Sequence, residues 1–286
     1  MSNVISNYRD NKELRDSFNE LAGKVFGLNF EGWYQNGFWK ENYNPYSVVV
    51  DGKVVSNVSV NQCSMNYDGR VVKLLQLGTV MTDPDYRGRG YAKEIMDKIM
   101  EEYDGKVDGI YLFGNDSVVT FYPKFGFKVG KEYQYTKAVS IENERTATPV
   151  PMGEKKDFDQ MVEILNQRAQ NAKMYMVGNS GLYMFYLSQF MQENVFYLKD
   201  SDTYVIAEEE EDTLILHAIL GDGEIDEVIK SFGSNIKNVV LFFTPKDPSG
   251  FEKSEYHEED TTFFVKGRFF EETKDEEFIF QAITHA

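Results

Sequence analysis

A stretch of alternating arginine and glycine, "YRGRGYA" at residues 86–92, has the composition of an anion-binding loop. It follows an apolar run and opens a helical pattern with one apolar face. The first amide N–H groups of a helix have no partner inside it and point along its axis. Gly88 and Gly90 let the backbone approach a ligand without a Cβ in the way, while Arg87 and Arg89 add positive charge. The stretch therefore predicts a site for a negatively charged group.

Two common anion loops are excluded by spacing. The stretch has neither the GxxxxGK[ST] order of a nucleotide P-loop nor the GxGxxG order of a dinucleotide fingerprint. It fits instead an Arg-x-x-Gly-x-Ala pattern formed by Arg87, Gly90 and Ala92. A second pattern follows in "NDSVVTFYPKFGF", in which an asparagine precedes a tyrosine by seven residues and a Gly-Phe pair comes next: Asn115, Tyr122, Gly126 and Phe127.

Together, over roughly residues 11–139, these patterns resemble the GNAT superfamily of acyl-coenzyme A-dependent N-acetyltransferases. Val118 stands where that family usually has alanine. The resemblance implies a coenzyme site in which the Arg/Gly loop holds the pyrophosphate and Asn115 contacts the pantetheine arm or the adenine side. The backbone of residues 80–82 would pair with pantetheine in a gap between two strands. The implied cofactor-binding residues are Val80, Met81, Thr82, Arg87, Gly88, Arg89, Gly90, Tyr91, Ala92 and Asn115.

The resemblance also implies a direct attack of an amine on acetyl-coenzyme A, with no covalent enzyme intermediate and no metal. Tyr122 would be the catalytic general acid that protonates the departing thiolate. Its alternative role is aromatic packing against Phe121, Phe125 and Phe127. A backbone amide near Val80 could polarise the thioester carbonyl.

The general base is not visible in the sequence. An amine with a pKa of ~10.4 must lose a proton before it attacks. The run "KLLQLGTVMT" has no acidic residue where many relatives carry a glutamate, and Gln76 is its nearest polar candidate. A water chain is the default. The tandem arrangement also resembles the enhanced-intracellular-survival family, without its third domain. In that family the C-terminal carboxylate reaches the active site, which here would be that of Ala286.

The order of elements suggests two similar α/β halves. We predict an α/β (α+β) GNAT fold, a mixed central sheet flanked by helices, over residues 1–142. The predicted strand "FKVGKEYQYTKAV" closes it. After a polar linker, residues 150–286 repeat the order of helix, aromatic helix, strands, helix and strands. We predict that they form a degenerate GNAT-like domain without a coenzyme site. Acidic residues crowd the helix start that corresponds to the Arg/Gly loop, where they would repel a pyrophosphate: Asp222, Glu224, Asp226 and Glu227.

Charge is unevenly spread along the 286 residues, whose net charge is −17. Residues 1–145 hold 18 basic and 20 acidic side chains, and the remainder holds 12 and 27. This excludes nucleic acid as a partner of the second half and favours a cationic one, although an acidic surface also simply keeps a protein in solution. The sequence shows no membrane span and no secretory signal. A single cysteine fits a cytoplasmic location.

Several residues are not assigned chemistry. His217 lies in an alternating strand, while His257 and His285 have no metal-ligand spacing around them. Cys63 has no neighbour that would activate a thiol. "EEEED" is interpreted as a solvated turn, or as the mouth of a cationic substrate site. The aromatic residues Trp33, Tyr34, Phe38 and Trp39 either pack in the core or form a wall of the acceptor pocket.

We therefore predict an acetyl-coenzyme A-dependent N-acetyltransferase that acts on a primary amine of a cationic small molecule or peptide. The alternative is a non-catalytic acyl-coenzyme A sensor or scaffold. The retained Tyr122 and Asn115 favour the enzyme, because a pure binder needs only the loop. The acceptor's identity, the base and the oligomeric state are not determined by the sequence.

Overall fold

The computed structural model describes residues 4–286. Its helices are α1 (Lys12–Phe26), α2 (Glu31–Gln35), α3 (Tyr91–Tyr103), α4 (Lys155–Gln167), α5 (Ser180–Gln189), α6 (Ile225–Ser231) and α7 (Arg268–Glu272). Short 3-10 turns lie at Pro84–Tyr86, Asp116–Val118, Tyr122–Phe125 and Ala282–Thr284. No helix within the described part of the chain is both long and apolar enough to cross a bilayer.

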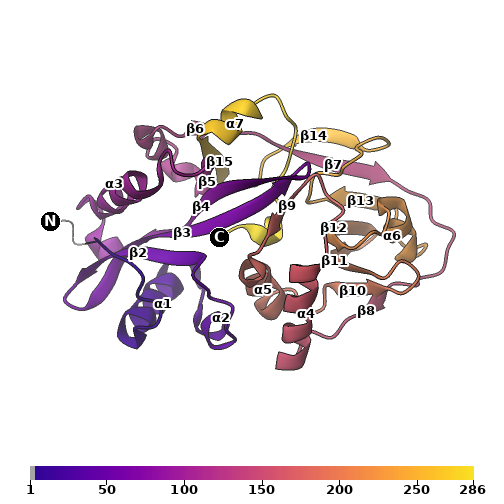
Figure 1. Ribbon diagram of the computed structural model, residues 1–286, viewed down its shortest axis with the longest axis horizontal. Coiled ribbons are helices and arrows are strands. Elements are labelled where there is room, and N and C mark those ends of the chain that lie inside the picture. Colours follow the sequence, from indigo (N-terminus) through magenta and orange to yellow (C-terminus); the bar gives the residue numbers. More distant parts are fainter. Residues whose placement is uncertain (1–3) are drawn as a thin grey trace.

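The strands form two mixed sheets, which occupy opposite ends of the molecule (Figure 1). The first contains β1 (Val4–Ile5), β2 (Tyr43–Val50), β3 (Lys53–Tyr67), β4 (Arg70–Thr82), β5 (Gly109–Asn115), β15 (Thr261–Lys266) and β6 (Lys128–Val129) in that spatial order, with β9 (Met174–Val177) also paired to β3. Only β4 and β5 are parallel, because α3 makes the crossover between them. The predicted helix after the Arg/Gly stretch is confirmed as α3.

The second sheet repeats this arrangement. Its order is β14 (Glu252–Tyr256), β7 (Glu132–Ala138), β13 (Asn238–Leu241), β12 (Thr213–Leu220), β11 (Thr203–Glu210), β10 (Val195–Leu198) and β8 (Thr148–Pro149). Here β12 and β13 are the parallel pair and α6 is the crossover between them. The predicted α/β class with mixed sheets flanked by helices is confirmed.

The two sheets exchange one strand each. β7 comes from the first half of the chain but pairs with β13, while β15 comes from the second half and pairs with β5 and β6. The prediction of one closing strand in "FKVGKEYQYTKAV" was therefore wrong. The segment divides at Gly130, whose N–H donates to the Phe263 carbonyl at 2.9 Å and where a Cβ would meet the Phe263 ring. The division into residues 1–142 and 150–286 stays a prediction, since each sheet draws on both.

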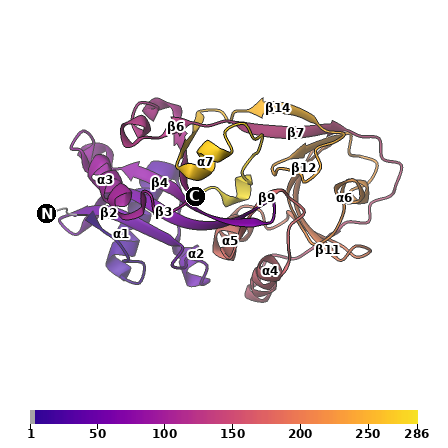
Figure 2. The ribbon, with the colours of Figure 1, turned by 45° about the horizontal axis from the view of Figure 1, so that its top comes forward.

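The C-terminal segment runs into the middle of the molecule, and both views place the C-terminus there (Figures 1 and 2). Phe278, Phe280 and Ile283 are buried in the largest apolar cluster, which also includes residues of α1, α2 and α5. Thr284 is fully buried and its hydroxyl donates to the carbonyl of Gln281 at 2.7 Å. The last residues of the chain are thus held as part of the core.

Glu132, at the start of β7, is a buried carboxyl group that makes stability depend on pH. It is 5% exposed, and its Oε1 accepts a hydrogen bond from the Phe280 N–H at 2.7 Å. Burial raises its pKa to about 8, the charge of Glu258 adds to this rise, and the Phe280 N–H opposes it. In the unfolded chain the Glu132 carboxyl group releases its proton near pH 4.3, whereas in the folded protein it holds the proton up to about pH 8. The free energy of unfolding therefore falls as pH rises from about 4.3 to about 8.

We expect Glu132→Gln to raise the melting temperature at pH 8 by about 5 °C, roughly 2 kcal/mol, because the amide keeps the acceptor oxygen without a buried charge. The gain should shrink towards zero near pH 4. Thermal unfolding across this range measures it, with Glu252→Gln on the exposed strand β14 as control. A gain that is independent of pH would contradict this account.

Candidate active site

The Arg/Gly loop joins β4 to α3 in the way that the sequence predicts. Gly88 and Gly90 both adopt a left-handed backbone, with φ of 74° and 84°, which other residues adopt only with strain. Gly90 is the N-cap of α3 and supplies no side chain to cap it, so the first amides of this 13-residue helix remain free for a ligand. Arg87 Nε donates to the Thr82 carbonyl at 3.4 Å, and the Arg89 guanidinium lies 4.7 Å from the centre of the Tyr86 ring.

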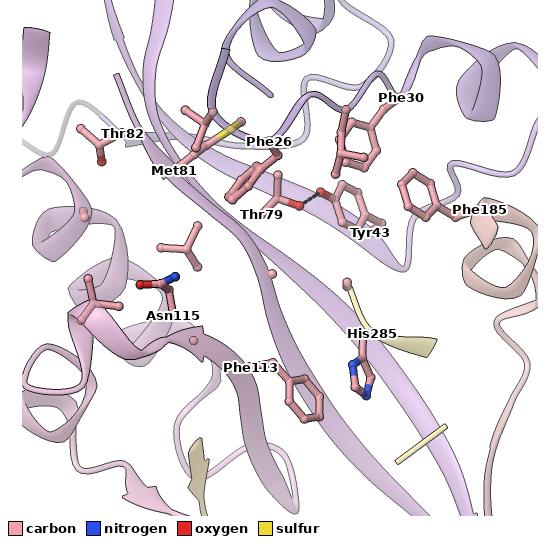
Figure 3. A pocket seen from close by; sticks show the side chains of 18 of the residues that line it. Phe26, Phe30, Tyr43, Thr79, Met81, Thr82, Phe113, Asn115, Phe185 and His285 are labelled. Carbon is pink, nitrogen blue, oxygen red and sulfur yellow. Dashed lines mark hydrogen bonds between the residues drawn. The ribbon is translucent and has the colours of Figure 1, made fainter. Parts of the chain in front are cut away.

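β4 and β5 separate beside this loop. Their parallel pairing runs from Leu74 opposite Gly109 to Leu77 opposite Leu112 and then stops. Beyond that point β4 bulges against β3, and Thr79 takes a φ of 47°. Two side chains support the bulge. The Tyr43 and Thr79 hydroxyls lie 2.6 Å apart (Figure 3), and Asn57 Nδ2 donates to the Thr79 carbonyl at 2.9 Å. The separation leaves the β5-facing edge of residues 78–82 without a strand partner.

Tyr122 combines the two roles considered for it. Its ring is 2% exposed and packs against Phe121, Phe127 and Phe264. The absence of a side chain at Gly114 gives it room, since a Cβ there would lie 2.8 Å from Tyr122 Cε2. Tyr122 also lines the cavity between the separated strands. Burial raises the pKa of its hydroxyl to about 12, which keeps it protonated at neutral pH.

Asn115 stands at the end of β5 and holds the turn that leads to Tyr122. Its Oδ1 accepts from the Ser117 N–H at 2.9 Å, and its Nδ2 donates to Asp260 from the other half of the chain. Both ends of the amide are engaged within the protein, so Asn115 holds the shape of the cavity wall, which it lines together with Ser117.

The last two residues of the chain enter the same gap. The Ala286 carboxyl group lies so close to Gly78 that a Cβ added there would overlap it. The tail is held by Tyr186, whose hydroxyl donates to the His285 carbonyl at 2.8 Å. With its amide oriented to satisfy its neighbours, Gln76 donates to the Thr284 carbonyl at 3.1 Å and accepts from the Ala286 N–H at 3.2 Å. Gln76 therefore positions the tail.

His285 is a site residue that the sequence did not reveal. Its ring stacks on Phe113 with 3.8 Å between ring centres, and within residues 4–286 its Nε2 has no hydrogen-bond partner. Burial lowers its pKa to about 3, so the ring is neutral. The one available signal was composition, because "FIFQAITHA" is an apolar run after an acidic segment and therefore indicates a buried end.

These elements enclose a cavity of about 760 Å³, a size typical of small-molecule sites. Seven predicted site residues line it: Val80, Met81, Thr82, Arg87, Ala92, Asn115 and Tyr122. The other four form the loop and the start of α3 and do not line the cavity: Gly88, Arg89, Gly90 and Tyr91. The roles assigned to all eleven stay predictions.

The opposite end of the cavity is aromatic and comes from both halves of the chain. Phe30, Trp33 and Tyr43 face Phe185 and Tyr186 of α5 there. Trp33 also donates from its indole nitrogen to the Gly181 carbonyl at 2.6 Å. Trp33 thus packs in the core, where it is 2% exposed, and also lines the cavity; its role in an acceptor pocket stays a prediction.

Of the residues without assigned chemistry, Trp33 and His285 line this cavity and the others lie outside it. His217 Nε2 lies 2.7 Å from Glu208 Oε1, and Cys63 is buried in a setting that raises the pKa of its thiol to about 12. Glu209 pairs with Arg145 at 2.8 Å, so the acidic run is partly neutralised within the protein. No group of three or more His, Cys, Asp or Glu side chains in residues 4–286 is placed to hold a metal ion.

Comparisons with known proteins agree with this geometry. A family model described as an acetyltransferase (GNAT) domain matches residues 9–130. The fold is similar to that of a conserved Enterococcus faecalis protein of unknown function, described as a probable N-acyltransferase, with a TM-score of 0.61 and 16% identity over 90% of this chain and 70% of that one. No curated protein matches the chain.

Two further structures share the fold. A GCN5-related N-acetyltransferase from Kribbella flavida gives a TM-score of 0.56 and 15% identity over 92% of this chain and 70% of that one. Eis1 from Mycobacterium abscessus gives 0.53 and 12% over 91% and 72%. The prediction that the chain is an acetyltransferase of this class is confirmed. Over residues 9–130 the chain is similar to the acetyltransferase (GNAT) domain that this family model describes.

Proposed function

We propose that the protein transfers an acetyl group from acetyl-coenzyme A to the nitrogen of a primary amine. The observation that carries this proposal is the convergence of three features on one cavity: the free helix start behind Arg87, the separated strands β4 and β5, and the protonated hydroxyl of Tyr122. A binding module would need the first two but not the third.

The reaction follows from this order of groups. The pyrophosphate of the coenzyme binds at the α3 N-terminus, and its pantetheine arm lies along the unpaired edge of residues 80–82. The amine nitrogen attacks the thioester carbonyl carbon, whose oxygen a backbone amide beside the bulge stabilises. Before the attack a base takes one proton from the ammonium form of the amine. The C–S bond then breaks, the leaving sulfur takes the Tyr122 proton, and the second proton of the nitrogen returns the tyrosine to its neutral form.

Ala286 is the base that we propose. Where the chain ends at this residue, its main-chain carboxylate stands against Gly78 in the gap between the strands. Gln76, where a glutamate was sought, holds the tail instead. The apolar surroundings help as well, because desolvation disfavours the charged form of an amine and so lowers its pKa.

Arg87→Glu should raise the KM for acetyl-coenzyme A by roughly 10- to 100-fold, because it replaces a charge-assisted contact with repulsion of the pyrophosphate. Its expected effect on kcat is small, since the reacting atoms lie elsewhere. Steady-state kinetics measure both constants. Lys98→Glu, an equal charge change on the outer part of α3, serves as control. An equal rise in the KM for acetyl-coenzyme A in both variants would show that Arg87 does not bind the pyrophosphate specifically.

Thiol release tests the function directly. Purified full chain is mixed with acetyl-coenzyme A and a panel of primary amines, and free coenzyme A thiol is followed with time. Release that depends on an amine supports the enzyme. Tight binding of the coenzyme, measured by calorimetry, with no amine-dependent release across the panel would favour the acyl-coenzyme A sensor instead.

A primary amine is protonated at neutral pH, so any such acceptor already meets the prediction of a cationic acceptor in its simplest form. The wider form of that prediction, a polycation guided by the acidic second half, rests on net charge alone. The lining of the cavity contributes no carboxylate side chain to it.

A further inference from the structure

The acceptor end of the cavity is built from aromatic rings. We call it the aromatic chamber and define it by Phe30, Trp33, Tyr43, Phe113, Phe185 and Tyr186. Phe30 and Phe185 stack with 5.1 Å between ring centres, and Trp33 meets Tyr43 edge to face at 5.2 Å. Across the gap, Phe113 stacks on His285. The chamber therefore has flat apolar walls on two sides.

Its position assigns it to the acceptor. Figure 3 shows Thr82 and Asn115 at one end of the cavity, Phe185 and His285 at the other, and the hydrogen-bonded pair of Thr79 and Tyr43 between them. A coenzyme held at the Arg/Gly loop reaches the bulge at Thr79 with its thioester. The chamber begins beyond that point, where the attacking amine must stand.

The polar groups of the chamber are already paired, and none is acidic. The Tyr43 hydroxyl is bonded to Thr79 and the Tyr186 hydroxyl to the His285 carbonyl. Although the chain contains 47 Asp and Glu residues, none of their side chains lines the cavity. A second ammonium group brought in would lose its water without gaining a carboxylate side chain, because the Ala286 carboxylate serves the reacting nitrogen in the proposed reaction, and this loss is costly. The chamber thus disfavours polyamines.

We infer that the acceptor is a primary amine joined by a short aliphatic link to an aromatic ring. This inference rests on the proposed acetyl transfer. The ring stacks between the two aromatic walls, while the short link carries the nitrogen back to the thioester beside Thr79. Such an acceptor carries a single charge, and that charge is the one removed in the reaction.

The first experiment compares acceptors at saturating acetyl-coenzyme A. Phenethylamine and tryptamine represent the inferred class, butylamine lacks the ring, and spermidine and lysine carry extra charge. We expect kcat/KM for the aromatic amines to exceed that for butylamine by about 100-fold, from burial of one ring, and that for spermidine by more. A higher kcat/KM for spermidine would overturn the inference while leaving acetyl transfer intact.

A variant locates the effect. Phe185→Ala removes one wall and should raise the KM for phenethylamine by about 30-fold, with the KM for acetyl-coenzyme A unchanged. Phe251→Ala makes the same change beside the second sheet and should alter neither constant. An unchanged KM for phenethylamine in Phe185→Ala would place the acceptor outside the chamber.

A binding measurement separates this inference from the proposed function. The chain has two tryptophans: Trp33 belongs to the chamber, and Trp39 stacks on Trp33 with 5.7 Å between ring centres. Saturable quenching of their fluorescence by phenethylamine, but not by spermidine, supports the aromatic acceptor site even where no thiol is released. No change with the aromatic amine overturns it. A preference for long-chain acyl-coenzyme A over acetyl-coenzyme A would also overturn it, since the chamber would then hold the acyl chain.

Discussion

Replacement of Gly78 by alanine is expected to lower kcat by about 1000-fold, the scale of losing a catalytic acid or base, while the protein remains folded. The added methyl group would occupy the place of the Ala286 carboxyl group, and a Cβ there would also lie 3.0 Å from the Ala286 Cβ. The tail must therefore leave the gap between β4 and β5. The proposed base leaves with it.

Two matched glycines separate this effect from a general cost of alanine. Gly32 and Gly153 have nothing within 4 Å of an added Cβ and no left-handed backbone, so Gly32→Ala and Gly153→Ala should retain full activity. Activity and thermal unfolding are measured for all three variants. A fully active Gly78→Ala would show that the tail plays no part in the reaction.

Extension of the chain tests the same tail by another route. A few residues added after Ala286 remove the carboxylate from its place beside Gly78 but leave the rest of the cavity untouched. Loss of activity with unchanged binding of acetyl-coenzyme A would assign the tail to the chemical step. Equal activity would point to water as the base.

Tyr122→Phe is the second change with a large expected effect, a fall in kcat of about 100- to 1000-fold, because a general acid contributes this much to the departure of a thiolate. The ring contacts with Phe121, Phe127 and Phe264 do not involve the hydroxyl, so stability should hold. Single-turnover kinetics measure the chemical step. Intact turnover in this variant would make Tyr122 a packing residue only.

The pH profile provides a second check on Tyr122. Burial raises the pKa of its hydroxyl to about 12, so the proton that it donates remains in place as pH rises through neutrality. We expect kcat to show no loss assignable to this tyrosine below about pH 10. A descending limb near pH 8 that Tyr122→Phe abolishes would contradict the account.

The Arg/Gly loop and the start of α3 could be predicted from the sequence because their parts are local. The left-handed backbones of Gly88 and Gly90 belong to the short turn that precedes α3, and the apolar face of α3 can be read from its own residues. The spacing from Asn115 to Tyr122 is likewise contained in one turn between β5 and the following segment. Glycine conformation, helical periodicity and motif spacing act over a few residues, so they were sufficient to predict these elements.

The acceptor end depends on contacts that no local pattern encodes. Phe185 and Phe30 stack across 155 positions of the chain, and Gln76 holds a tail more than 200 residues away. The strand exchange has the same character, because β7 pairs with β13 and β15 with β5, and in each pair the two strands lie 100 or more residues apart in the sequence. Pattern alone could place these strands in the sequence but not choose their partners.

The net charge of −17 does not describe the lining of the cavity, for a related reason. Surface carboxylates determine the total, and many of them pair with nearby lysine or arginine, as Glu209 does with Arg145. The cavity is lined mainly by uncharged side chains, which do not contribute to the net charge. The proposed recognition of the acceptor rests on these lining residues.

The most direct test of the central claim is the fate of a labelled acetyl group. Full-length protein is incubated with acetyl-labelled acetyl-coenzyme A and the amine panel, and the products are separated. The account predicts that the label appears as an N-acetyl amide in equal amount to the coenzyme A released, and that Tyr122→Phe forms almost none. Label that stays on the coenzyme in the presence of every amine, while the coenzyme binds tightly, would contradict acetyl transfer as the function of this protein.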